Sequence, residues 1–271
     1  MLGRLGEIGG PDVIGRAGAK AATLARLAQA GLPVPDGFVV ETGWFERWHL
    51  AARTDSVPPD LSPELRIAID VQFGSAAVAV RSSAVDEDQA DASFAGQYTT
   101  VLDVRGAAAI EEALVRCWSS AYDTRVASYR ALQTRDLAQR IGMGVLVQRL
   151  VQARLAGVAF TSDPFAGERA DTVISAVRGL GDRLVSGEAA ADEWVVRGGV
   201  ATCRVAPERV LEPTTALRIA SGWASPSRRW RLPGSCRRSK TDSGRSSTAA
   251  LVCPSDQHRR MPWSMVGSTP R

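Results

Sequence analysis

The sequence predicts an α/β (α+β) protein of two subdomains, with a mixed sheet in the first, an antiparallel sheet in the second, and a basic tail after them. In the first part, apolar residues at helical spacing alternate with short apolar runs, which is typical of helices and strands that follow one another. After Gly142, short β-branched runs separated by turn residues favour an antiparallel sheet. We therefore expect a first subdomain over residues 1–105, a helical connection over 106–139 and a sheet-rich subdomain over 140–212.

The first predicted helix covers residues 18–30, where apolar side chains recur three and four positions apart. Gly31 follows at the position of a left-handed C-terminal cap, and the prolines after it cannot continue the helix. A strand is expected next at Phe38–Val40. The other elements of the first part are listed by residue: helices over 41–73 with a break at 56–60, a strand over Ala76–Val80 ending at Arg81, a strand after Gly96, and helices over 107–133 separated near Asp123.

The second part shows four short apolar runs of strand character, each bounded by glycine, proline or acidic turn residues. They lie at residues 143–151, 156–162, 171–177 and 193–199. Because the turns between them are short, we expect neighbouring strands to run in opposite directions.

The tail over residues 213–271 differs from the rest of the chain in charge and pattern. It carries a net charge of +9, whereas the residues before it carry −5. After Ser221 no apolar periodicity remains, and two interpretations stay open: a disordered basic tail, or an out-of-frame or otherwise disrupted end. Nucleic-acid binding rests on this tail alone and is therefore the least favoured class of function.

Several classes of protein are disfavoured by composition. The sequence has no apolar run of about 18 residues and no signal-peptide pattern at its start, so we expect a soluble, cytoplasmic protein without a membrane segment. Its four cysteines have no metal-binding spacing, which favours ordinary thiols over a zinc module or a disulfide scaffold. The pattern identifies no metal ligands.

Two cations are candidates for binding phosphate. Lys20 opens a helix after small residues, where an anion would meet both the ammonium and the positive end of the helix dipole. Arg81 follows an apolar strand and is followed by Ser82 and Ser83, which add hydroxyl donors beside a guanidinium that matches phosphate oxygens. The alternatives are a solvated lysine and an arginine paired with the acids of residues 86–91.

Two further positions have a binding and a structural interpretation. Gly96 stands between an aromatic residue and a strand, which suits either close approach of a ligand or a tight turn. Gln148 interrupts an apolar strand, and its amide would either read a base or ribose or satisfy a buried backbone group.

Four segments taken together resemble the ATP-binding domain of phosphoenolpyruvate synthase, pyruvate phosphate dikinase and rifampin phosphotransferase. The segments are residues 19–42, 79–104 (beginning "AVRSSAVDEDQADASFAGQYTT"), 116–131 and 147–196. Their order and spacing are similar to those of the family from about Gly10 to Pro213.

This resemblance implies an ATP-grasp-like fold in which ATP and Mg2+ lie between two subdomains. A phosphoryl group would then pass from ATP to a histidine on a separate swivelling domain or chain. By position, Lys20 and Arg81 resemble the phosphate-gripping cations of the family, with Arg81 the catalytic residue. Gly96 and Thr100 resemble the loop that closes on the nucleotide, and Gln148 resembles a nucleotide contact from the second sheet.

The sequence departs from the family after Pro213, where the family pattern L-L-Q-x-R-P and its metal- and phosphate-binding side chains find no match. The leading hypothesis is therefore an ATP-dependent phosphotransferase domain that does not complete the transfer alone. The alternative is a catalytically incomplete nucleotide-binding fragment or a regulatory module that needs a partner chain.

Overall fold

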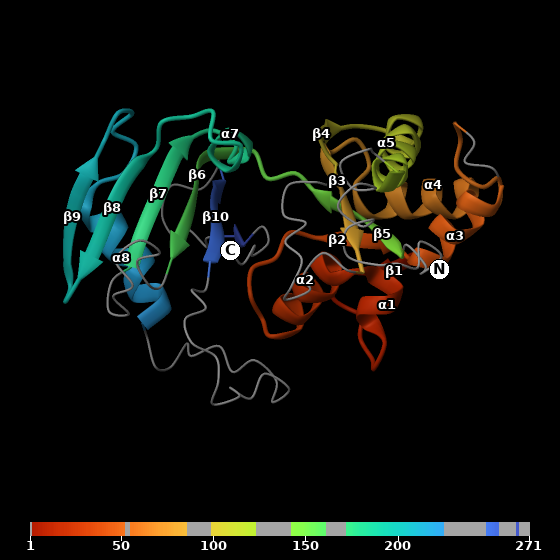
Figure 1. The fold of residues 1–271 in the computed structure, drawn as a ribbon, viewed down its shortest axis with the longest axis horizontal. Coiled ribbons are helices and arrows are strands. Elements are labelled where there is room, and N and C mark those ends of the chain that lie inside the picture. Colours follow the sequence, from red (N-terminus) through yellow and green to blue (C-terminus); the bar gives the residue numbers. More distant parts are fainter. Residues whose placement is uncertain are drawn as a thin grey trace, which may run out of the picture. The chain divides into compact units, whose positions relative to one another are not determined.

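The computed structural model describes residues 2–51, 55–85, 99–122, 142–160, 172–224, 248–254 and 264–265. The chain divides into two compact units (Figure 1). Unit 1 comprises residues 1–29 and 35–150, and unit 2 comprises residues 30–34 and 151–271. Within the part of the chain that the structure describes, no helix is both long and apolar enough to cross a membrane.

The described part of unit 1 is built around a five-stranded sheet with the order β1-β2-β5-β3-β4. Its strands are β1 (Leu2–Arg4), β2 (Gly37–Val40), β3 (Val78–Ala84), β4 (Thr100–Val104) and β5 (Met143–Arg149). Every pair of neighbours in this sheet is antiparallel. The expected mixed sheet is therefore wrong, because β5 inserts between β2 and β3 and runs opposite to both.

Helices cover both faces of this sheet (Figure 1). The helices α1 (Val13–Ala17) and α2 (Ala19–Gln29) lie on one face. The other face carries α3 (Thr42–Leu50), α4 (Leu61–Gln72), α5 (Ala107–Ser119) and the 3-10 turn η1 (Ser120–Tyr122). The predicted helices over 18–30 and 41–73 correspond to α2, α3 and α4, and the second predicted helix after Asp123 lies outside the described residues.

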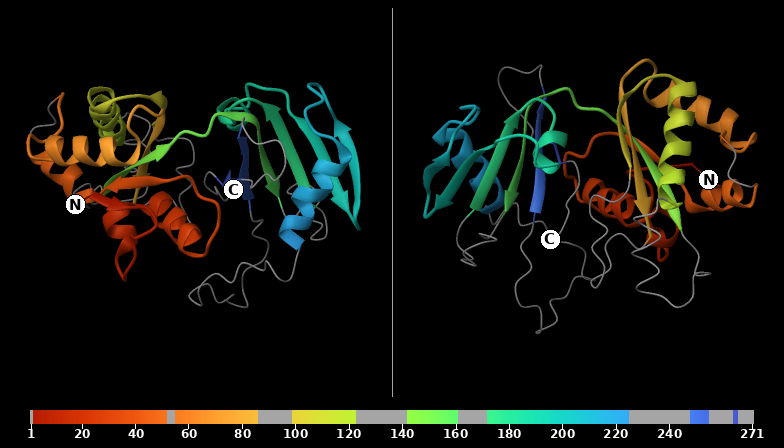
Figure 2. Two further views of the ribbon diagram at one scale, coloured as in Figure 1. Left: turned by 180° about the vertical axis from the view of Figure 1, so that it is seen from behind. Right: turned by 45° about the horizontal axis from the view of Figure 1, so that its top comes forward.

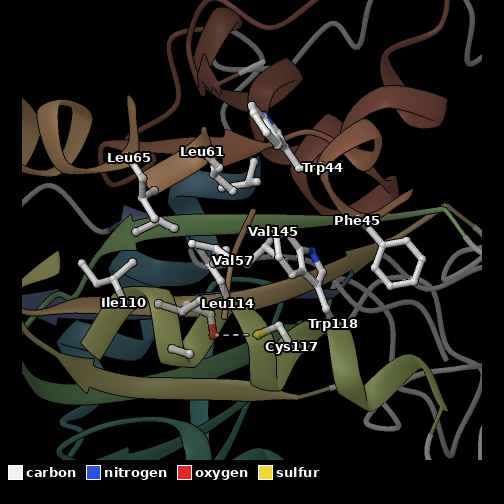
Figure 3. Close-up of a cluster of buried hydrophobic side chains, with 14 of the residues drawn as sticks. Trp44, Phe45, Val57, Leu61, Leu65, Ile110, Leu114, Cys117, Trp118 and Val145 are labelled. Atoms are coloured by element: carbon white, nitrogen blue, oxygen red, sulfur yellow. Dashed lines mark hydrogen bonds between the residues drawn. The ribbon is translucent and has the colours of Figure 1, made fainter. Parts of the chain in front are cut away.

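The main core of unit 1 fills the space between the sheet and α3, α4 and α5. Trp48 and Trp118 are fully buried there with ring centroids 5.6 Å apart, and Leu61 and Leu65 of α4 face Ile110 of α5 across the same cluster (Figure 3). Burial of one such large apolar side chain contributes about 1.5–3 kcal/mol. This layer fixes the sheet that carries the candidate site.

The described part of unit 2 contains a six-stranded sheet with the order β11-β10-β6-β7-β8-β9. Its strands are β6 (Ala153–Phe160), β7 (Thr172–Arg178), β8 (Asp192–Arg197), β9 (Val200–Val205), β10 (Thr248–Pro254) and β11 (Ser264–Met265). Neighbouring strands in it are antiparallel, as predicted for this part of the chain. Along the chain, a short helix, α7 (Asp182–Val185), connects β7 to β8.

Helix α8 (Pro213–Ala224) packs on one face of this second sheet (Figure 2). Its buried residues Ala216, Ile219 and Ala220 meet Ile174 and Trp194 of the sheet in one apolar cluster. Two segments of the predicted basic tail over residues 213–271 have regular structure, and for its other residues the prediction stays a prediction. Residues 213–224 are helical, and β10 pairs along β6.

Two further expectations about strands are corrected. The strand of residues 76–80 does not end at Arg81, because β3 continues to Ala84 in register with β5. The polar Ser82 and Ser83 do not interrupt it, since both are fully buried with hydrogen-bonded hydroxyls. Residues 143–149, expected in the second sheet, form the central strand of the first.

Candidate functional site

The candidate site lies on the face of the first sheet that meets α2. Side chains alternate between the two faces along a strand. In β3, Val78, Val80 and Ala84 belong to the core beside α3, α4 and α5. Arg81 and Ser83 alternate with them and therefore lie on the opposite face of the sheet. A hydrogen bond from the α2 backbone to the Ser83 hydroxyl confirms that this is the α2 face.

Gly18 sets how closely the start of α2 approaches β3. Its φ is +80°, and a Cβ at this position would lie 1.8 Å from the Ser83 carbonyl oxygen. An L side chain is excluded by both the conformation and the space. The preceding residue, Ala17, lies equally close to β5, because a Cβ on Gly144 would meet the Ala17 carbonyl oxygen at 2.4 Å.

Lys20 reaches the edge of β3 from this helix. Its Nζ donates a hydrogen bond of 2.9 Å to the carbonyl oxygen of Ser82, and its side chain is partly buried. The amide of Ser82 donates to the carbonyl of Thr99, and the two backbone groups of a strand residue point to the same side. The ammonium therefore lies on the β4 side of β3, where β4 begins.

Arg81 and Thr100 are neighbours across this edge. They are paired in register between β3 and β4, so their side chains lie on the same face of the sheet. Arg81 is partly buried and Thr100 is exposed. The structure thus brings Lys20, Arg81 and Thr100 to the middle of β3, where β4 begins to pair with it.

The start of β4 is held by Ser82. Its hydroxyl donates a hydrogen bond of 2.9 Å to the Thr99 carbonyl, which also accepts the Ser82 amide at 3.1 Å. Beneath this junction, the thiol of Cys117 (labelled in Figure 3) lies within hydrogen-bonding distance of the carbonyls of Val80 and Thr99, to which it can donate. The serines after Arg81 therefore fix backbone here, a role that sequence reasoning missed because their partners lie far away in the chain.

The pKa of the Cys117 thiol depends on its burial and on the charges around this junction. Burial raises the pKa of its thiol from 9.0 to about 12, while the charge of Lys20 and a backbone hydrogen bond lower that pKa by less. The charge of the Lys20 ammonium thus favours the Cys117 thiolate, but desolvation of the thiolate has the larger effect on the pKa.

Gln148 lies on the same face as Arg81 but in the first sheet, which corrects the expectation that it belongs to the second. It is paired with Ala79 of β3. Its side chain is 2% exposed, and its amide nitrogen donates a hydrogen bond of 2.9 Å to the Pro35 carbonyl. This contact is the structural alternative that the sequence left open, and a nucleotide contact by Gln148 stays a prediction.

Two expectations about the site fall partly outside the described residues. Gly96 and the acids of residues 86–91 are among the residues that the structure does not describe. Among the residues it does describe, no group of three or more histidine, cysteine, aspartate or glutamate side chains could hold a metal ion.

Comparisons with known proteins place the chain in a family. Residues 49–207 match the family described as pyruvate phosphate dikinase, AMP/ATP-binding domain. The match includes Arg81, Thr100 and Gln148, whereas Lys20 precedes it.

Curated relatives extend the similarity. An uncharacterized phosphotransferase, YvkC of Bacillus subtilis, is 34% identical over 66% of this chain and 23% of its own length. A probable phosphoenolpyruvate synthase of Staphylothermus marinus is 32% identical over 79% of this chain and 30% of its own. A rifampicin phosphotransferase of Streptomyces is 36% identical over 69% of this chain and 25% of its own.

The chain spans between 23% and 30% of the length of these three relatives, which are larger proteins. The family match at residues 49–207 covers more than half of the 271 residues of the chain. The chain therefore belongs to the family of the AMP/ATP-binding domain of pyruvate phosphate dikinase.

Proposed function

We propose that the chain binds ATP through Lys20 and Arg81 on the α2 face of the unit 1 sheet. The observation that carries this proposal is the hydrogen bond of 2.9 Å from Lys20 Nζ to the carbonyl of Ser82, the residue next to Arg81. It brings an ammonium from α2 to the strand that bears the guanidinium. Membership of an AMP/ATP-binding family supports a nucleotide as the ligand of these two cations.

The two cations suit the chemistry of phosphoryl transfer. This reaction depends mainly on positioning and on neutralising charge at phosphate oxygens. A guanidinium can hold two such oxygens at once, whereas an ammonium acts as a compact point charge. We assign Arg81 to the transferred phosphoryl group as the catalytic residue, and Lys20 to the phosphate chain of the nucleotide.

The remaining assignments are part of the same proposal. Thr100, the first residue of β4, and Gly96 take part in binding the nucleotide, and Gln148 contributes a contact to it. We infer an ATP-grasp-like mode of nucleotide binding from the resemblance to this family. Mg2+ reaches the site bound to ATP, because this ion is commonly held by substrate phosphates with only one or two carboxylates.

The whole reaction that we propose is transfer of a phosphoryl group from ATP to a histidine on another domain. Relatives named phosphoenolpyruvate synthase and rifampicin phosphotransferase support a phosphotransferase, and their greater length leaves room for further domains. The chain supplies the ATP-binding part of such a protein.

Calorimetric titration with MgATP tests the binding site. We expect Lys20→Ala and Arg81→Ala each to weaken ATP binding about tenfold or more, since a hydrogen bond to a charged group contributes about 1.5–3 kcal/mol. Arg26→Ala is the matched control, because Arg26 is an exposed cation on the same helix whose guanidinium contacts Thr23.

The control should bind ATP like the wild type, and circular dichroism should show all three variants folded. Equal ATP affinity in the wild type, Lys20→Ala and Arg81→Ala would contradict the assignment of the site. Failure of the wild type to bind ATP would contradict the proposed function itself.

A further inference from the structure

The hydroxyl of Ser83 is the hydrogen-bond acceptor for the first turn of α2. The first amides of a helix have no partner within the helix and are commonly capped by a side chain at the preceding position. Gly18, which precedes α2, has no side chain. Instead, the amide of Ala21 donates a hydrogen bond of 3.0 Å to Ser83 Oγ, which comes from a strand 62 residues away in the sequence.

This cap is built into a tight contact. Ser83 is fully buried, and its carbonyl and hydroxyl both press against Gly18 at distances that a Cβ could not share. The hydrogen bond and the contact therefore fix the distance between the start of α2 and β3 at Ser83.

That point lies next to both cations of the proposed site along their elements. Ala21 is the next residue after Lys20 on α2, and Ser83 is two residues after Arg81 on the same face of β3. One hydroxyl thus joins the helix that carries the ammonium to the strand that carries the guanidinium. A small shift of α2 would move Lys20 Nζ away from the Ser82 carbonyl while leaving Arg81 in the sheet.

We propose that Ser83 is a positioning residue for ATP binding, whose hydroxyl sets the place of the Lys20 ammonium relative to Arg81. This inference rests on the proposed function of the two cations. Ser83 itself donates nothing to ATP in this scheme, since it acts through the backbone of α2.

The sequence offers a selective probe of Lys20. The chain has two lysines, Lys20 and Lys240. Protein labelled with 13C at the lysine ε-carbon therefore gives two signals, which Lys240→Arg assigns. The chemical shift of the Lys20 signal reports the surroundings of its ammonium with no ATP present.

The experiment compares Ser83→Ala with Ser120→Ala. Ser120 is also buried in unit 1, and its hydroxyl donates a hydrogen bond of 2.7 Å to the Cys117 carbonyl, away from α2. We expect Ser83→Ala to shift the Lys20 signal and to weaken MgATP binding about fivefold, the size of effect that follows loss of a helix cap. Ser120→Ala should leave both unchanged, although it also loses a buried hydrogen bond.

The two readouts separate the possible failures. An unchanged Lys20 signal in folded Ser83→Ala would overturn the positioning role, whether or not ATP binds. A shifted signal with unchanged ATP affinity would overturn it as well, because the position of the ammonium would then not matter for binding. If the wild type binds no ATP, the proposed function fails first, and the claim about ATP falls with it.

A second variant guards against loss of folding in Ser83→Ala. Ser83→Cys keeps nearly the same shape but replaces the oxygen with a sulfur that accepts hydrogen bonds weakly. Its effect on the Lys20 signal and on ATP affinity should lie between those of wild type and Ser83→Ala. A value equal to wild type in both measurements would contradict the proposal.

Discussion

Burial controls the chemistry of Cys117, which lies beneath the junction of β3 and β4. Its thiol is enclosed by the core of unit 1, and the two carbonyls that it contacts can accept a hydrogen bond from the thiol but cannot donate one to a thiolate. The Lys20 charge favours the thiolate, yet burial dominates and the pKa rises to about 12. A thiol held neutral in this way is a packing residue at neutral pH, not a nucleophile.

We expect the stability of the protein to fall with rising pH at Cys117. The unfolded thiol loses its proton near pH 9.0 and the folded one near 12, so this contribution is fully present below 9.0 and is lost between these values. In that window the free energy of unfolding of the wild type should fall by about 1.4 kcal/mol per pH unit more than that of Cys117→Ala. Urea unfolding at pH 8, 9.5 and 10.5 measures the difference; parallel pH profiles would contradict it.

At the scale of elements, one carboxylate ties the segment that leads to α8 to the second sheet. Asp192 begins β8 and is fully buried. Its two oxygens accept backbone amides from Glu208, Arg209, Val210 and Leu211, the segment that leads to α8. Four donors converge on a group that can only accept, which explains why a charged residue is tolerated inside the unit.

We expect Asp192→Asn to destabilise unit 2 by about 3 kcal/mol, because an amide group would turn a donor toward buried donors. Glu193→Gln is the matched control, since Glu193 is the next residue and forms a partly exposed ion pair with Arg204. Its cost should stay below about 1 kcal/mol. Urea unfolding with hydrogen exchange at residues 208–211 measures both variants. Equal losses of unfolding free energy would show that the four hydrogen bonds to Asp192 contribute no more than the surface ion pair.

The sequence predicted most elements but not how the strands pair. Apolar periodicity located α2, α3 and α4, and β-branched runs located β5 to β8. The same runs carry no information on which strands pair, so the prediction finds the strand β5 but places it in the wrong sheet. Helix α8 was missed because it shares its stretch of sequence with basic residues that dominate the composition after residue 213.

The charged residues of the candidate site could be predicted from the sequence, but the residues that hold them in place could not. Lys20 lies at the start of α2 and Arg81 follows an apolar run, and the resemblance of both residues to a family suggests a common role. Ser83 and Gly18 act through a contact between residues about 65 positions apart, which no local pattern can reveal. Only the fold brings the hydroxyl to the helix that it caps.

At the scale of the whole molecule, the chain corresponds to a fraction of each relative, 23% in one and 30% in another. Transfer of a phosphoryl group needs an acceptor within reach of ATP. No match to the family pattern L-L-Q-x-R-P follows Pro213 in this sequence. We therefore expect the two cations of unit 1 to hold a nucleotide while the acceptor of the phosphoryl group comes from another domain.

We expect the chain alone to bind ATP but not to turn it over steadily. A separately produced histidine-bearing domain of a relative, together with the groups that the chain lacks, should become phosphorylated when mixed with the chain and ATP labelled in its β- and γ-phosphoryl groups. The label should be acid-labile, as phosphohistidine is, and Arg81→Ala should abolish it while Arg26→Ala does not. Steady turnover of ATP by the purified chain, lost in Arg81→Ala, would contradict this prediction, because the chain would then be a complete catalyst.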